Sequence, residues 1–244
     1  MITKADILSH RRNGSWRELE RIARALTQNA KEQGDSFFAP VLGGGTRLML
    51  AMEHRISDDI DLFVDSPAWL PYVSPRTNDR YENDLMSYNE EGDHVKWVFP
   101  NGEIDFIVRT PLLDPQRLWN PPAEETAFAL EPPLEVLAKK LFYRGWALTP
   151  RDLFDWYSVA QYVPVDDEDR IEVAKLLASK LDDLNSALMQ LPVKRQAIHA
   201  WEAIKAPFVP DLRDTVEWAK EEVVTFGLLA KDIKRKRDGD EISL

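Results

Sequence analysis

Two short segments of the chain hold the residues whose types and spacing could do chemistry. The first is a glycine triplet that ends at Gly45 and is followed by Thr46, and the second is the pair Asp59 and Asp61. Residues two apart on a strand share a face, so these two carboxylates are expected to project the same way. Adjacent carboxylates repel each other and resist desolvation unless a cation neutralises them. Because oxygen ligands suit Mg²⁺ or Mn²⁺, the pair predicts a divalent metal site.

A third carboxylate is expected to complete this site. Asp105 lies between Ile104 and Phe106 in a segment that is otherwise apolar, so a charge there needs a reason. In a two-metal site, one metal lowers the pKa of an attacking hydroxyl, and the other stabilises a triphosphate and its leaving pyrophosphate. We expect Asp59 and Asp61 to share the second metal, and Asp105 to bind the first and help accept the proton.

The glycine segment is expected to supply the complementary half of the site. Gly44 and Gly45 let the backbone approach a phosphate closely, and amide groups at the start of the following helix favour anions. The Thr46 hydroxyl is expected to be a further donor. Glycine turns and paired acids are each common, so either motif alone is a weak indication. Together they predict a phosphate cradle beside a metal site.

The order and separation of these motifs resemble the first motif of the DNA polymerase β-like nucleotidyltransferase superfamily, in the form found in the AbiEii/AbiGii toxin-type family. The matching residues are Gly44-Gly45-Thr46, then His54-Arg55-Ile56-Ser57, then Asp59-Ile60-Asp61-Leu62. Later motifs of that family resemble Leu137-Ala138-Lys139-Lys140-Leu141 with Arg144, and Pro150-Arg151-Asp152-Leu153-Phe154-Asp155. The matches span about residues 41–156.

The resemblance implies a nucleotidyltransferase whose metals are held by its acidic pair. It implies that nucleotide phosphates meet the glycine turn and the basic residues of the helical half. Lys140 and Arg144 lie four residues apart on one helical face and are expected to reach the phosphates together, whereas Lys139 points about 100° away and is expected to be solvated. The nucleotide-binding residues are therefore expected to be Gly44, Gly45, Thr46, Arg55, Ser57, Lys140, Arg144 and Asp152.

Several of these residues also have an ordinary structural interpretation. Arg55 can serve as the partner of a nearby carboxylate, and Lys140 and Arg144 can pair with acids on their own helical face. Asp152 can complement a helix dipole. Asp58, next to the acidic pair, is expected to be solvated.

The elements that must position these residues divide the chain into two halves that differ in predicted secondary structure. Up to about residue 110, glycine turns alternate with short β-rich runs, and after the proline-rich stretch from Asn120 to Pro133 helix follows helix. We expect an α+β protein. A nucleotidyltransferase-like domain with a small mixed β-sheet is predicted over residues 1–125 and an all-α domain over residues 126–244, with the nucleotide and metal between them.

Hydrophobic periodicity and turn signals locate the elements. A helix is predicted from a Ser15–Glu18 capping box to Gly34. A strand over 36–42, a helix over 46–53 and a strand over 59–64 follow, and strands over 95–99 and 103–108 flank the hairpin dipeptide Asn101-Gly102. Helices are predicted from Pro133 to Gly145, from Thr149 to Pro164, and over 167–190, 193–205 and 211–235. Trp146, Trp156, Trp201 and Trp218 are expected to pack inside the helical half.

Composition excludes several classes of function. The chain has 244 residues, with 31 basic and 42 acidic, and a net charge of -11, which argues against a sequence-blind nucleic-acid binder but allows a local basic patch. Absence of cysteine excludes disulfides, thiolate nucleophiles and iron–sulfur clusters. The four histidines show no standard zinc spacing. One dense basic cluster is expected to be a solvated helix end, with an RNA-backbone contact as the alternative: Lys231, Lys234, Arg235, Lys236 and Arg237.

The expected function combines these observations. We expect a cytoplasmic protein without a membrane partner, because no segment resembles a signal peptide or a membrane span of about 18 apolar residues. It is predicted to move a nucleoside monophosphate from an NTP to an acceptor hydroxyl on RNA such as tRNA, with Mg²⁺ or Mn²⁺, as the toxin of a toxin–antitoxin or phage-defence system with an antitoxin partner. The alternatives are an AMPylating-type transferase that modifies protein, and a non-catalytic nucleotide- or partner-binding protein of the same fold.

Overall fold

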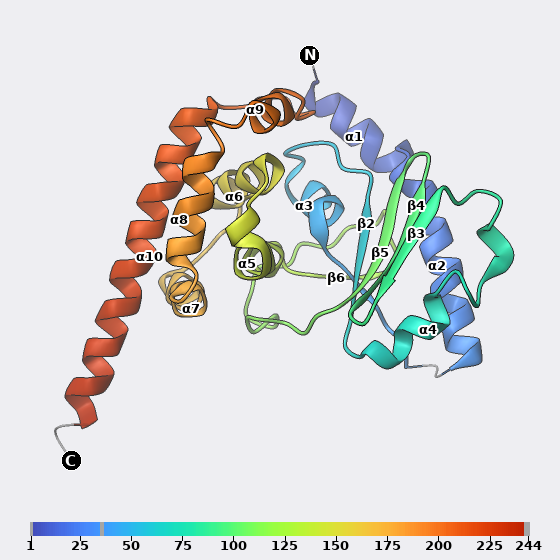
Figure 1. Ribbon diagram of the computed structural model, residues 1–244, viewed down its shortest axis with the longest axis horizontal. Coiled ribbons are helices and arrows are strands. Elements are labelled where there is room, and N and C mark those ends of the chain that lie inside the picture. Colours follow the sequence, from blue (N-terminus) through green and yellow to red (C-terminus); the bar gives the residue numbers. More distant parts are fainter. Residues whose placement is uncertain (1, 35–36, 242–244) are drawn as a thin grey trace. The chain divides into compact units, whose positions relative to one another are not determined.

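The computed structural model describes residues 2–34 and 37–241, which form two compact units (Figure 1). The first unit comprises Met1–Pro111, Asn120–Pro133 and Lys205–Pro207. The second comprises Leu112–Trp119, Leu134–Ile204 and Phe208–Leu244. The proline-rich stretch therefore packs largely within the first unit, and residues 205–207 return to it, where the Ile56 amide donates to the Lys205 carbonyl at 2.9 Å.

The first unit is built on a six-stranded mixed sheet in the order β3-β4-β5-β2-β1-β6. Two neighbouring pairs, β2 with β5 and β1 with β6, are parallel, and the others are antiparallel. Together with the helical second unit, this sheet confirms the predicted α+β class. The strands are β1 (Val41–Leu42), β2 (Ile60–Val64), β3 (Ser87–Glu91), β4 (His94–Phe99), β5 (Gly102–Val108) and β6 (Ala129–Leu130).

Alternation along the central strands gives the sheet one apolar face. In β2, β4 and β5, each second residue is buried, as the alternation of apolar and polar side chains requires. This face packs against α2 (Trp16–Gln33), whose apolar residues recur at helical spacing. The shared core includes Leu19, Leu26, Leu62 and Phe106. The polar residues of the same strands consequently project from the other face.

Shorter helices complete this unit. They are α1 (Lys4–Asn13), α3 (Gly44–Met52), α4 (Leu70–Val73) and the 3₁₀ turns η1 (Pro67–Trp69) and η2 (Asp79–Tyr81). Hydrophobic periodicity predicts α3 but not α1, whose capping box joins Thr3 and Asp6. α1 was missed because it buries only Ile7 and therefore shows little apolar periodicity.

Three local predictions for this unit differ from the structure. Ser15 precedes α2, but its hydroxyl donates to Asp58 instead of capping the helix. The strand predicted over 36–42 is reduced in the structure to Val41–Leu42, and residues 35 and 36 lie outside the described part. The tight turn between β4 and β5 is Pro100-Asn101, because Gly102 already pairs with Phe99.

The second unit consists of helices. They are α5 (Pro133–Arg144), the 3₁₀ turn η3 (Gly145–Ala147), α6 (Pro150–Tyr162), α7 (Asp167–Leu177), α8 (Leu181–Gln190), α9 (Arg195–Glu202) and α10 (Leu212–Glu241). The single helix predicted over 167–190 is wrong, because a turn at 178–180 separates α7 from α8. Trp156 and Trp201 are buried as predicted, whereas Trp146 is 69% exposed.

The C-terminal basic cluster lies partly outside the described side chains. Lys231 and Arg235 are exposed on α10, and the side chains of Lys234, Lys236 and Arg237 lie outside the described residues. Over the described part of the chain, no helix combines the length and apolarity that crossing a membrane requires.

Candidate active site

The first and strongest feature of the site is a row of charged side chains across three strands. Asp61 on β2 is the register partner of Asp105 on β5, and Asp105 is the partner of Lys96 on β4. Register partners on neighbouring strands project from the same face. The structure therefore places the two predicted carboxylates side by side, on the face opposite the apolar core.

Asp59 lies just before β2, and its carboxylate bonds to β5. Its Oδ1 accepts a hydrogen bond from the Glu103 amide at 3.1 Å, and its carbonyl accepts one from the Thr46 hydroxyl at 2.6 Å. Glu103 precedes Asp105 by two residues on β5. All three predicted acids are thus attached to the β2–β5 pair.

The glycine turn between β1 and α3 packs directly against Asp61. Gly44 has a φ of +63°, and a Cβ built on it overlaps the Asp61 carboxylate and lies 2.8 Å from the Asp61 Cβ. The Gly43 amide also donates to the Asp61 carbonyl at 2.9 Å. Only glycine accommodates both this backbone conformation and this close approach. The bend that precedes the helix is therefore held against the acidic strand.

The next residue of the turn is packed against two of the predicted nucleotide-binding residues. A Cβ added to Gly45 would lie 2.7 Å from both the Arg55 Nη2 and the Ser57 Oγ. Arg55 and Ser57 are both buried, so they line the inner side of the turn. The first amide groups of a helix have no partner within the helix, so α3 presents its N–H groups at this place.

The Thr46 side chain does not match the expectation of a phosphate donor. It is fully buried, and its only hydroxyl proton is donated to the Asp59 carbonyl. This bond fixes the first turn of α3 to the residue that precedes β2. Thr46 consequently positions the acidic pair instead of offering its hydroxyl to a ligand.

Burial and a neighbouring negative charge disfavour the ionised form of Asp105, so a nearby cation would stabilise it. Burial raises its pKa, the neighbouring Lys96 opposes this, and the Asp61 charge adds to it, which brings the pKa to about 6. Lys96 Nζ stands 3.5 Å from Asp105 Oδ2, while Asp105 Oδ1 is buried and has no hydrogen-bond partner within the described residues. Carboxylate oxygens of Asp105 and Asp61 are of the type that Mg²⁺ or Mn²⁺ prefers, but ligand atoms of Asp59, Asp61 and Asp105 do not all lie within 4.8 Å of one another in the described structure.

The basic residues predicted to bind phosphate in the second unit form a buried ionic cluster. Lys140 Nζ lies 2.7 Å from Asp152 Oδ1 and 3.0 Å from Asp155 Oδ2. Arg144 also pairs with Asp152, and its side chain is 51% exposed. Lys140 is therefore already neutralised by two acids on α6. That the exposed part of Arg144 binds phosphate stays a prediction.

Asp152 has a structural task at the start of α6. Its Oδ2 accepts from the Thr149 hydroxyl at 2.7 Å, which completes a capping box. Burial acts to raise the pKa of Asp152, but Lys140 and Arg144 outweigh it and hold the pKa at about 2. The carboxylate is consequently charged under all ordinary conditions.

Two residues, one in each unit, differ from their predicted solvated state. Lys139 is buried on α5, where its Nζ lies 3.6 Å from Glu135 Oε1. Glu135 in turn accepts from the amides of Leu112 and Leu113. Asp58, in the first unit, is bound by the Ser15 hydroxyl and by His10 Nε2 at 3.0 Å. The Ser15 and His10 partners of Asp58 and the Leu112 and Leu113 amides at Glu135 come from distant segments, whereas Glu135 lies only four residues before Lys139.

Three charged residues around the glycine turn and the carboxylates were not found from sequence. Lys96 was hidden because the register of β4 with β5 is needed to place it beside Asp105. Glu131 is buried, and its Oε2 would be 2.6 Å from a Cβ on Gly43. Arg47 is fully buried and donates from Nε to the Glu131 carbonyl at 2.7 Å. The one sequence signal for Glu131 is a charge within an apolar and proline-rich run.

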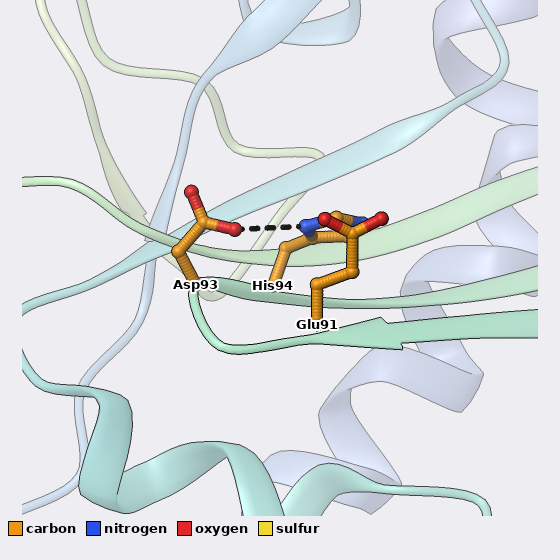
Figure 2. Close-up of side chains that lie close together, drawn as sticks. All are labelled: Glu91, Asp93 and His94. Carbon is orange, nitrogen blue, oxygen red and sulfur yellow. Dashed lines mark hydrogen bonds and ion pairs between the residues drawn. The ribbon is translucent and has the colours of Figure 1, made fainter.

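A second group of possible metal ligands lies at the β3–β4 hairpin. Figure 2 shows Glu91, Asp93 and His94, whose ligand atoms lie within 4.8 Å of one another. Both acids are exposed, and Asp93 already bonds to His94 at 3.1 Å and to Arg109 at 2.7 Å. These partners lower the pKa of Asp93. The cluster is therefore a set of ion pairs that closes the hairpin.

Comparison with known proteins agrees with the geometry of the first unit. The family model described as "Nucleotidyl transferase AbiEii toxin, Type IV TA system" matches residues 24–225. This range includes the glycine turn, the three carboxylates, the α5–α6 cluster and the helices up to α10. A search of curated proteins found no match.

Proposed function

Because the chain belongs to the AbiEii family of nucleotidyl transferase toxins of type IV toxin–antitoxin systems, we propose that it transfers a nucleoside monophosphate from an NTP to a hydroxyl of RNA. A tRNA end is the proposed acceptor. The proposal goes beyond the family assignment in naming the acceptor, the metal and the residues. The protein is proposed to act in the cytoplasm with an antitoxin as its partner.

One observation carries this proposal, namely the contact between the glycine turn and the acidic strand. A triphosphate needs close backbone amides, and its transfer needs a divalent cation between the phosphates and the protein. Gly44 places the first turn of α3 directly on Asp61, and Asp61 is paired in register with Asp105. This contact supports the proposal that the phosphate cradle and the cation ligands lie together in the first unit.

The proposed reaction is an exchange of one phosphorus–oxygen bond for another. The acceptor hydroxyl oxygen forms a bond to the α-phosphorus, and the bond from that phosphorus to the oxygen leading to the β-phosphate breaks. Pyrophosphate leaves with the electron pair of the broken bond. The hydroxyl proton is proposed to pass to Asp105, through the carboxylate oxygen that does not hold the cation.

The other residues of the site bind and position the reactants. Asp59, Asp61 and Asp105 would hold Mg²⁺ or Mn²⁺, and this cation, when bound, supplies charge neutralisation at the phosphates and a lower pKa for the attacking hydroxyl. The amides of Gly44 and Gly45 bind the triphosphate. Arg55 and Ser57 line the turn, while Thr46 holds Asp59 in position.

The experiment is a transfer assay with the purified protein, unfractionated tRNA, Mg²⁺ and each NTP labelled at its α-phosphate. We expect label on tRNA from one or more NTPs, and a loss of at least 100-fold for Asp61→Asn, since removal of a transition-state electrostatic contact costs about 10²–10³. Asp58→Asn is the matched control, because Asp58 binds Ser15 and His10 outside the row. Label that goes to protein alone, or binding of NTP without transfer, contradicts the proposal.

A further inference from the structure

A row of cationic side chains runs along the exposed side of α2, in the same unit as the three carboxylates. Arg17, Arg21 and Arg24 are spaced by four and three residues, which places them within about 60° of one another around the helix. Lys31 continues the row at the end of the helix. Arg21 and Arg24 are exposed, and Arg17 is half-buried, with its guanidinium over the Trp16 ring.

This row carries uncompensated positive charge. No ion pair or side-chain hydrogen bond of Arg21, Arg24 or Lys31 is found within residues 2–34 and 37–241. Two of the three acids of α2 bond to other segments, and the third, Glu32, accepts from Gln28 at 2.7 Å next to Lys31 at the end of the helix. Glu18 accepts from Asn101 at 3.0 Å, and Glu20 is buried, where it accepts from Thr126. A chain with a net charge of -11 therefore keeps one unneutralised basic helix face.

The N-terminal end of α2 lies close to Asp59 of the candidate active site. The residue before α2, Ser15, bonds to Asp58, and a Cβ on Gly102 would lie 2.9 Å from Leu19 Cδ1 and 3.2 Å from Asp59 Oδ1. The first turns of α2 are thus next to the residues that carry Asp59. From Arg17 to Lys31 the row extends about 21 Å at 1.5 Å per residue.

We propose that this face of α2 binds the phosphate backbone of the acceptor RNA, and that the reactive end passes around the end of the β2–β5 pair, near Asp59, to the carboxylates on the other face of the sheet. The inference rests on the proposed function in one respect, that the acceptor is RNA. Arginine is the side chain best suited to phosphate, because its planar guanidinium donates in a bidentate manner. The row accounts for how an acidic protein holds an anionic substrate.

The test is binding of fluorescein-labelled unfractionated tRNA to the full chain, measured by anisotropy over a range of salt concentrations. The variant Arg21→Gln/Arg24→Gln removes two exposed charges that support no described contact. Each phosphate contact contributes about 0.7–0.9 to the slope of log K against log salt, so this slope should fall by about 1.4–1.8 and affinity by roughly 10- to 30-fold at 0.15 M salt. In the transfer assay, KM for tRNA should rise while KM for NTP stays unchanged.

Two control variants isolate the position and the charge. Arg195→Gln/Arg213→Gln removes the same charge from exposed residues of the second unit and should leave the salt slope unchanged. Arg21→Lys/Arg24→Lys keeps the charge and should retain most of the affinity. Thermal unfolding of each variant verifies that the fold is intact.

The outcomes separate this inference from the proposed function. If the glutamine variant binds tRNA with the affinity and salt slope of the unchanged protein, the α2 inference is wrong, even where label transfer proceeds. The inference is equally wrong if that variant loses only the binding of an acidic protein partner. If the row binds tRNA but no NTP yields labelled tRNA, the inference holds and the proposed reaction fails.

Discussion

Replacement of Gly44 by alanine tests the contact on which the site depends. Gly44 has a φ of +63°, a region that costs a residue with a Cβ about 1–2 kcal/mol. The added methyl also overlaps the Asp61 carboxylate and approaches its Cβ to 2.8 Å. Because the Asp61 Cβ is attached to a paired strand, rotation of the carboxylate alone does not relieve the overlap.

The expected loss of stability follows from these two costs. Overpacking of a close contact costs about 1–3 kcal/mol, so Gly44→Ala should lower the free energy of unfolding by about 2–5 kcal/mol in total. At about 2–4 °C per kcal/mol for a chain of this size, the melting temperature falls by roughly 4–20 °C. Transfer activity should fall by at least 100-fold at temperatures where the variant is folded, since the amides of the turn no longer meet the phosphates.

The assay combines thermal unfolding with label transfer from NTP to tRNA at a temperature well below the melting point. Gly92→Ala is the matched control, because a Cβ on Gly92 meets no atom within 4 Å and its backbone is not in the left-handed region. That variant should retain both stability and transfer. Retention of full transfer by Gly44→Ala would refute the reasoning, because the turn would then not contact the reactants.

Three further predictions concern buried charges. Asp105→Asn should abolish transfer yet raise the free energy of unfolding by about 1–3 kcal/mol at pH 8 without metal. Because the pKa of Asp105 is raised in the folded state, the unchanged protein should lose stability as the pH rises from about 4 to 6, which chemical unfolding at each pH measures. Asp152→Asn leaves Lys140 with fewer partners and should cost about 3–5 kcal/mol near pH 7. Since the folded pKa of Asp152 is about 2, its stabilising effect is present above about pH 4 and is lost towards pH 2 in acid unfolding curves, but not in this variant. Arg47→Met removes donors to Glu131 and Asn120 and should lower the melting temperature by roughly 5–15 °C.

Local signals in the sequence were sufficient for the acidic strand and the glycine turn. The alternation around Asp61 predicted a strand with one apolar face, and the glycine triplet predicted the bend before α3. Both depend on residues close in sequence. The family resemblance indicated the type of reaction, nucleotidyl transfer, which composition and spacing alone left open.

Contacts between distant segments could not be predicted in the same way. Lys96 joins the row only through the register of β4 and β5, and Glu131 reaches Gly43 because it directly follows β6, which pairs with β1 from a distant part of the sequence. Thr46 was taken for a ligand because its hydroxyl partner, the Asp59 carbonyl, belongs to a different element. Lys139 was expected to be solvated because Glu135 and the loop that it binds were not recognisable as its surroundings.

The central claim is that the carboxylates on β2 and β5 hold a divalent cation beside the glycine turn. Electron paramagnetic resonance of free Mn²⁺, titrated with the purified protein, measures this binding without any reaction. We predict that the unchanged protein and Asp58→Asn bind Mn²⁺ with the same affinity, while Asp61→Asn loses at least tenfold. Equal Mn²⁺ binding by Asp61→Asn and the unchanged protein would contradict the account.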